Sequence, residues 1–135
     1  MSLGVHLLIE YENCDRKAIN DRELVREKML ESVERSGATI VREVFHTFAP
    51  QGVSGVIVIA ESHVTVHTWP EHGYAAVDVF TCGDKIKSIE IVNGLKSGFG
   101  AKDVHVKKIL RGPRASVSSD FKLPSVMDRE IPPIK

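Results

Sequence analysis

The alternation of apolar and polar residues along the chain predicts six β-strands and two α-helices. Residues 63–69, HVTVHTW, alternate strictly, as expected for a strand with one buried face. Residues 56–60, VIVIA, are continuously apolar and β-branched, as in a buried strand. The expected strands are residues 4–11, 38–48, 56–60, 63–69, 74–82 and 102–110, with one helix after the first and another after the fifth.

The first helix is indicated by apolar residues that recur at every fourth position. Val25, Met29 and Val33 are spaced at i, i+4 and i+8, which places them on one helical face. Asn20, followed three residues later by a glutamate, resembles a capping box and predicts where the helix begins. Gly37 is a suitable end, because glycine readily adopts the left-handed conformation that closes helices.

A similar pattern indicates the second helix after residue 83. Asp84 is a possible N-cap, and Ile86, Ile89 and Val92 are spaced along one side. Gly98 and a second glycine two residues later interrupt the pattern and predict the end of the helix.

The order of these elements predicts an α+β fold, a largely antiparallel sheet with two helices on one face. The two halves resemble each other, because 14–38 and 82–101 each carry a cysteine, an aspartate, a helix and a Gly-Ala pair. This repetition favours two βαβ-type halves. The face of the sheet without helices must contact water or a partner. We therefore expect a homodimer in which two sheets stack.

Composition and charge narrow the class of protein. The chain has 135 residues, 42% hydrophobic and 27% charged, which suits one globular domain. Its 18 basic and 18 acidic residues balance, without a basic block, so we expect no nucleic-acid partner. No apolar run approaches the ~20 residues that span a bilayer, and the N-terminus turns polar too early for a signal peptide. We therefore expect a cytoplasmic protein without a membrane partner. The domain is expected to end at residue 110, before a Pro/Ser-rich tail, 111–135.

The chemically reactive side chains are concentrated between residues 59 and 83. This stretch holds three of the six histidines, the only tryptophan and one of the two cysteines. Alternate residues of a strand share a face, so His63 and His67 fall together, and Cys82 can lie on the same side from the next strand. Ser62 has the opposite parity. The backbone is therefore expected to be irregular at residues 61–62, or the chain to be discontinuous there.

These residues suggest two kinds of site, a metal site and a cysteine–histidine pair. The spacing of His63, His67 and His72 would suit zinc on a helix, but on strands only two of them share a face, so we expect no metal. Cys82 ends a strand before a helix, whose dipole can lower a thiol pKa, and is a candidate acid or nucleophile. Cys14 fits better as a small buried hydrophobic residue.

The segment from Gly52 to Gly83, GVSGVIVIAESHVTVHTWPEHGYAAVDVFTCG, resembles the prokaryotic S-adenosylmethionine decarboxylase proenzymes. Glu-Ser-His, His-Thr-Trp-Pro-Glu and Phe-Thr-Cys-Gly all occur at the spacing of that family, and the similarity extends over roughly residues 3–110. The resemblance implies that the chain cleaves itself between Glu61 and Ser62.

The same resemblance implies how a cofactor is made. The Ser62 hydroxyl attacks the carbonyl of Glu61, the resulting ester undergoes β-elimination, and Ser62 becomes a covalent pyruvoyl group. His67 is expected to assist the elimination, and Ser54 to support the intermediate. The expected products, which stay associated, are a β chain, 1–61, and an α chain, 62–135.

The implied reaction is the decarboxylation of S-adenosylmethionine, whose product is the aminopropyl donor for spermidine synthesis. The substrate forms a Schiff base with the pyruvoyl ketone, which acts as an electron sink. Cys82 is the expected proton donor to the α-carbon. Phe48 and Trp69 are expected to stack on the adenine and hold the sulfonium, and Glu71 to bind the ribose hydroxyls. Active sites of the family lie at a dimer interface.

Two alternatives remain open at this point. Relatives with the same pyruvoyl scaffold decarboxylate arginine, and pocket residues such as Phe48 and Trp69 would decide between the two substrates. A non-enzymatic α+β module could instead use its histidines to bind a metal or a small ligand. That alternative predicts one intact chain and gives no reason for the Glu61-Ser62 pair.

Overall fold

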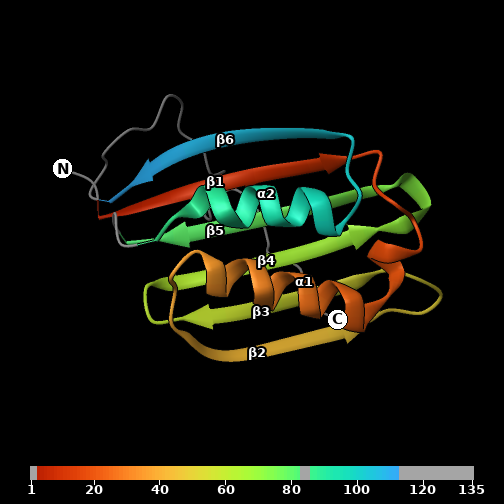
Figure 1. Ribbon diagram of the computed structural model, residues 1–135, viewed down its shortest axis with the longest axis horizontal. Coiled ribbons are helices and arrows are strands. Elements are labelled where there is room, and N and C mark those ends of the chain that lie inside the picture. Colours follow the sequence, from red (N-terminus) through yellow and green to blue (C-terminus); the bar gives the residue numbers. More distant parts are fainter. Residues whose placement is uncertain (1–2, 83–85, 113–135) are drawn as a thin grey trace, which may run out of the picture.

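A computed structural model describes residues 3–82 and 86–112 of the chain. Within these ranges six strands form one sheet, in the order β2-β3-β4-β5-β1-β6, and two α-helices run roughly along the strands (Figure 1). The strands are β1 (Gly4–Glu12), β2 (Ile40–Thr47), β3 (Val53–Ile59), β4 (Ser62–Trp69), β5 (Tyr74–Thr81) and β6 (Asp103–Arg111). The helices are α1 (Arg22–Arg35) and α2 (Ser88–Gly98), with the short 3-10 helices η1 (Ala18–Asn20) and η2 (Pro70–His72).

All neighbouring strands of the sheet are antiparallel. Across the sheet, β1 and β2 therefore run in the same direction and are joined through α1. Likewise β5 and β6 run in the same direction, on either side of β1, and are joined through α2. Parallel strands need a long crossover connection, which a helix supplies. The two βαβ-type halves that the sequence predicts are thus confirmed.

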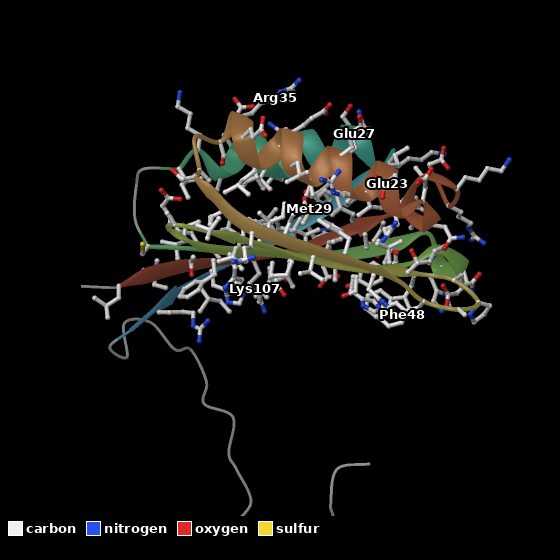
Figure 2. The ribbon with its side chains drawn as sticks, turned by 90° about the horizontal axis from the view of Figure 1, so that it is seen from below. Glu23, Glu27, Met29, Arg35, Phe48 and Lys107 are labelled. Atoms are coloured by element: carbon white, nitrogen blue, oxygen red, sulfur yellow. The ribbon has the colours of Figure 1, made fainter. Side chains whose placement is uncertain are left out.

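Both helices cover the same face of the sheet (Figure 2). Val25, Met29 and Val33 of α1 are fully buried against it, which confirms the predicted apolar stripe. On the sheet, alternate residues of each central strand, such as Ile57 of β3 and Val77 of β5, belong to the same buried cluster. Each of these side chains contributes about 1.5–3 kcal/mol by leaving water. The core therefore lies in the layer between helices and sheet.

The predicted start of α1 is wrong by one residue. The N-cap is Asp21, whose carboxylate accepts a hydrogen bond from the Leu24 N–H at 3.1 Å. Asn20 instead ends η1, and its side-chain oxygen accepts a hydrogen bond from the Gly52 N–H at 2.9 Å. The short helix before α1 turns Asn20 toward the loop between β2 and β3, which leaves the capping position to Asp21.

The second helix also begins later than predicted. Its first residue is Ser88, its N-cap is Lys87, and Asp84 lies outside the described residues. Cys82 is thus six residues before the first residue of α2 along the chain. Ile89 is 60% exposed rather than buried. The buried residues of α2 are Ile91, Val92 and Leu95.

The face of the sheet opposite the helices is here called the open face. Phe48 and Lys107 project from it in Figure 2. Val44, Val56 and Val58 on β2 and β3 are 68%, 39% and 41% exposed, so this face is partly apolar. None of the helices in the described part of the chain is long and apolar enough to cross a membrane. Of the predicted tail, residues 113–135 lie outside the described ranges, and β6 includes the first residue.

Candidate active site

Strands β3 and β4 form a hairpin that is closed by Ala60 and Glu61. Ile59 and Ser62 are the last paired residues, so the chain turns back where the sequence predicts an irregular backbone. Ser62 begins β4 with a φ angle of +152°, which residues with a side chain rarely adopt. Such a conformation costs about 1–3 kcal/mol and is found mostly at functional sites. The backbone is therefore strained beside the Glu61–Ser62 peptide bond.

The carbonyl group of that bond is held by a backbone donor. The Cys82 N–H donates a hydrogen bond to the Glu61 carbonyl oxygen at 3.2 Å. The pairing of Ser62 with Thr81 on β5 brings Cys82 to this position. A donor at a carbonyl oxygen stabilises the negative charge that develops when a nucleophile adds to the carbon. The Cys82 thiol itself is exposed. Glu61, Ser62 and Cys82 are here called the cleavage end of the sheet.

Ser54 and His67 meet at the other end of the same hairpin. They are direct partners in the register of β3 and β4, and both belong to the open face. The Ser54 hydroxyl donates to the Val66 carbonyl at 3.3 Å. The register therefore places Ser54 and His67, which were predicted separately, next to each other.

A row of aromatic rings surrounds His67 on the open face. The His67 ring lies between Phe48 and Trp69, with centroid distances of 5.5 and 4.2 Å. Trp69 in turn stacks on Tyr74, at 5.2 Å and an interplanar angle of 28°. The edge of His46 meets Phe48 at 4.7 Å. Such ring faces suit a flat base or a cation. Ser54 and these rings are here called the aromatic end.

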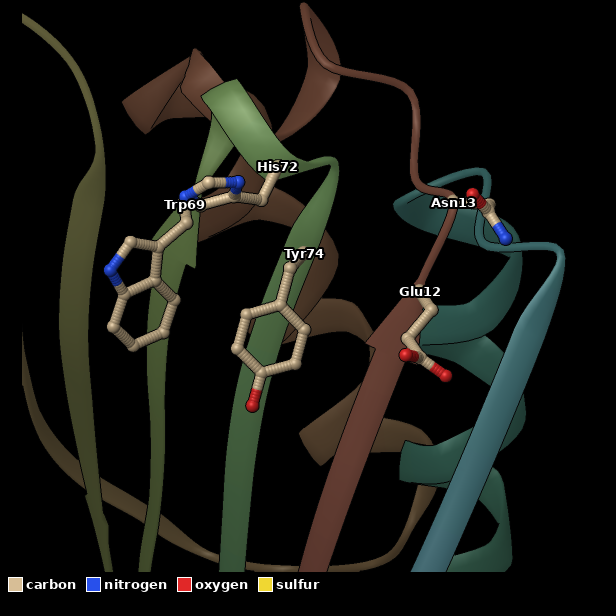
Figure 3. Close-up of a pocket in the computed structure, with 5 residues that line it drawn as sticks. All are labelled: Glu12, Asn13, Trp69, His72 and Tyr74. Atoms are coloured by element: carbon tan, nitrogen blue, oxygen red, sulfur yellow. The ribbon is translucent and has the colours of Figure 1, made fainter.

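A pocket of about 470 Å³ opens beside the row (Figure 3). Glu12 and Asn13 line it together with Trp69, His72 and Tyr74. Tyr74 was not predicted as a site residue from the sequence, although it is the register partner of Trp69 across the turn and the two rings face the same side. Glu71, predicted to hold a ribose, is exposed on η2 next to this pocket.

The two ends are far apart within one chain. Ser62 and His67 are five residues apart on β4, which corresponds to about 16 Å. His67 pairs with Ala76 on β5, and Cys82 is six residues after Ala76. His67 and Cys82 therefore lie on the same face of the sheet but at opposite ends of it. The predicted common side is therefore correct, but one copy does not bring all the predicted residues together.

The remaining histidines and the second cysteine do not extend the site. His63 contacts Phe80 at 5.6 Å between ring centroids, and His72 lies at the pocket. Among residues 3–82 and 86–112, no three His, Cys, Asp or Glu side chains form a cluster that could hold a metal ion. Cys14 is buried, as predicted, and burial raises the pKa of its thiol to about 11.

Fold and site together define a class, an α+β domain with a strained Glu-Ser hairpin turn at one end of its sheet and aromatic rings at the other. A family model described as S-adenosylmethionine decarboxylase matches residues 5–112. The chain belongs to the S-adenosylmethionine decarboxylase family.

Individual relatives agree with this assignment. The chain is 50% identical over 111 residues to the S-adenosylmethionine decarboxylase proenzyme of Thermotoga maritima, covering 82% of this chain and 85% of that protein. It is 48% identical to the proenzyme of Acidithiobacillus ferrooxidans, with coverages of 82% and 84%. The crystal structure of adenosylmethionine decarboxylase from Aquifex aeolicus superposes with a TM-score of 0.77 at 33% identity, covering 88% of this chain and 98% of that one. The predicted family and fold class are confirmed.

Proposed function

We propose that this chain is an S-adenosylmethionine decarboxylase that converts its own Ser62 into a pyruvoyl cofactor. The geometry of the Glu61–Ser62 bond carries the proposal. The φ angle of Ser62 is strained, and the Cys82 N–H is placed on the carbonyl that must be attacked. The family assignment supports the same conclusion.

Self-cleavage can be written with all atoms accounted for. Ser62 Oγ bonds to the carbonyl carbon of Glu61, the C–N bond breaks, and the hydroxyl proton ends on the nitrogen. The Ser62 α-proton is then removed and the Cβ–O bond breaks, which releases the Glu61 carboxylate. Water displaces the nitrogen as ammonia and leaves the pyruvoyl group. The backbone strain at Ser62 and the Cys82 N–H both favour the first step.

The proposal requires a second copy of the chain on the open face. Ser54 and His67 are the proposed helpers of cleavage, but they are about 16 Å from Ser62 along β4. A two-fold axis between stacked sheets would place the aromatic end of one copy over the cleavage end of the other. Stacked sheets lie about 10 Å apart, so side chains from both meet in the middle. The exposed apolar side chains of β2 and β3 suit such a contact.

The residues around Ser62 suit the chemistry that follows cleavage. A pyruvoyl group at this position supplies an electron sink for the electrons left when carbon dioxide departs. Cys82 presents an exposed thiol beside Ser62 and is the proposed proton donor to the α-carbon. Cys82 binds Glu61 through its backbone N–H, so its thiol remains available as a proton donor. The cytoplasm is the proposed compartment, because it keeps such a thiol reduced.

The aromatic end supports an adenosyl substrate over arginine. Phe48 and Trp69 offer ring faces to adenine and to the sulfonium cation, and Glu71 offers a carboxylate to the ribose hydroxyls. Arginine could stack its guanidinium on one of these rings, but it carries neither an adenine nor a ribose. Release of carbon dioxide from each carboxyl-labelled compound distinguishes the two substrates. A preference for arginine would overturn the choice.

Intact-mass measurement of the purified chain tests the self-processing step. We expect two fragments, with the α chain lighter than its unmodified sequence by one ammonia and blocked at its N-terminus. Ser62→Ala should abolish cleavage, because it removes the nucleophile. Ser97→Ala, an exposed serine on α2, should cleave like the natural chain. A single full-length mass for the natural chain after prolonged incubation would overturn the proposal.

A further inference from the structure

The side chain of Glu61 has a partner of its own, apart from the contact of its carbonyl. The Thr39 N–H donates a hydrogen bond to Glu61 Oε1 at 3.2 Å. The Thr39 carbonyl accepts a second one from the Ala60 N–H at 2.8 Å. Thr39 directly precedes β2, so the start of that strand is tied to both residues of the hairpin turn.

Glu61 is thereby held from two sides. The Cys82 N–H, at the end of β5, binds its carbonyl oxygen, and the Thr39 N–H binds its carboxylate. Ala60, which precedes it, carries the bond that joins the turn to Thr39. The acyl group that must accept the Ser62 hydroxyl therefore has few ways to rotate. Attack on a carbonyl needs the two reacting atoms about 3–3.5 Å apart and aligned, and small displacements are costly.

We propose that the Glu61 carboxylate is a positioning group for self-cleavage, acting through its hydrogen bond with the Thr39 N–H. This inference rests on the proposed function. The carboxylate takes no part in the bond changes, in which Ser62 Oγ bonds to the Glu61 carbonyl carbon and the peptide nitrogen leaves with the hydroxyl proton. Its contact with Thr39 keeps that carbon in line with Ser62 Oγ.

The mechanism predicts which side chains can replace Glu61. A backbone N–H needs an acceptor at a fixed distance, and it does not require a negative charge. Glutamine keeps the length and offers an amide oxygen. Alanine offers no acceptor, and aspartate keeps the charge but is shorter by one methylene. Length and acceptor, rather than charge, should therefore decide the rate of cleavage.

The test is a time course of cleavage in the full-length chain, followed by intact mass after synthesis. Glu61→Ala and Glu61→Asp should each cleave about tenfold more slowly than the natural chain, as expected for loss of one hydrogen bond to a charged group. Glu61→Gln should cleave within about threefold of it. Glu27→Ala, which removes an exposed carboxylate from α1 (Figure 2), is the matched control and should cleave normally. Thermal unfolding of each precursor is measured alongside, and Glu61→Asp provides the comparison if Glu61→Ala does not fold.

Hydroxylamine locates the slowed step, because it cuts esters and leaves amides intact. The slowed variants should accumulate precursor that resists hydroxylamine, since the first acyl shift is the step that needs positioning. Equal rates for the natural chain and Glu61→Ala would overturn the inference. Cleavage of Glu61→Gln as slow as Glu61→Ala would overturn it too, because charge would then be the requirement. A natural chain that never cleaves would instead overturn the proposed function itself.

Discussion

At the cleavage end, Glu61 and Ser62 are held by main-chain contacts and by an unfavourable φ angle, whereas at the aromatic end Phe48, His67 and Trp69 are held by contacts between rings. The first end is a tight turn with one exposed thiol beside it. The second is a broad surface next to a pocket. Both ends include residues of the β3–β4 hairpin, but they differ in the contacts that hold them and in the surface that they expose.

The difference follows from two tasks. Breaking a peptide bond requires that the bond itself be fixed, which main-chain hydrogen bonds and strain achieve. Holding a flat, cationic ligand requires side-chain area, which the rings supply. Substitutions at the cleavage end should therefore slow or stop a chemical step, and those at the aromatic end should weaken binding by degrees. His67 is the proposed exception, because it acts on the cleavage end of another copy.

The largest expected effect tests whether the two ends come from different copies. Neither Ser62→Ala nor His67→Ala should complete cleavage alone. Co-expressed with different tags, they form mixed dimers in which the intact Ser62 of one copy faces the intact His67 of the other. About half of the His67→Ala chains should then be cleaved if copies pair at random. Intact mass after tag-selective purification measures this. Mixed dimers without any cleavage would contradict the shared site.

A smaller effect separates the two roles of Cys82 at the cleavage end. Cys82→Ala keeps the backbone N–H, so self-cleavage should continue at close to its normal rate. Decarboxylation per pyruvoyl group should fall at least ~100-fold, because the proton donor is lost. Labelled carbon dioxide release and intact mass are measured on the same sample. Cys14→Ala changes the buried thiol and is the control. Unimpaired turnover in Cys82→Ala would remove it as the donor.

The smallest effect concerns the rings of the aromatic end. Trp69→Ala should raise KM for S-adenosylmethionine about tenfold, since one stacking surface is lost, with kcat changed only a few-fold. Trp69→Phe keeps a ring and should lie between this variant and the natural chain. Steady-state rates on fully processed enzyme measure both parameters. A fall in kcat at constant KM would assign Trp69 to the chemistry rather than to binding.

Much of the fold was predictable because it depends on local periodicity. The alternation in residues 63–69 and the stripe beginning at Val25 specify a strand and a helix wherever they are placed. The predictions were wrong where a contact with a neighbouring element sets the local structure. Asn20 and Asp21 are both suitable N-cap residues. Because Asn20 belongs to η1, Asp21 becomes the N-cap of α1. Ile89 faces water, whereas Gly94 of the same helix lies so close to α1 that a side chain there would collide with Ser32.

The types of the elements, the resemblance to one family and the candidate reactive residues could be predicted from the amino-acid sequence, because these depend on residue type and short spacing. Which of those residues meet depends on the tertiary structure. It placed the Cys82 and Thr39 amides on Glu61 and paired Ser54 with His67. The distance of about 16 Å between Ser62 and His67, in contrast, follows from local geometry, as the rise of five residues in one strand. The physical reason why the other residues meet is that strand register and hairpin position bring together residues that are far apart along the chain.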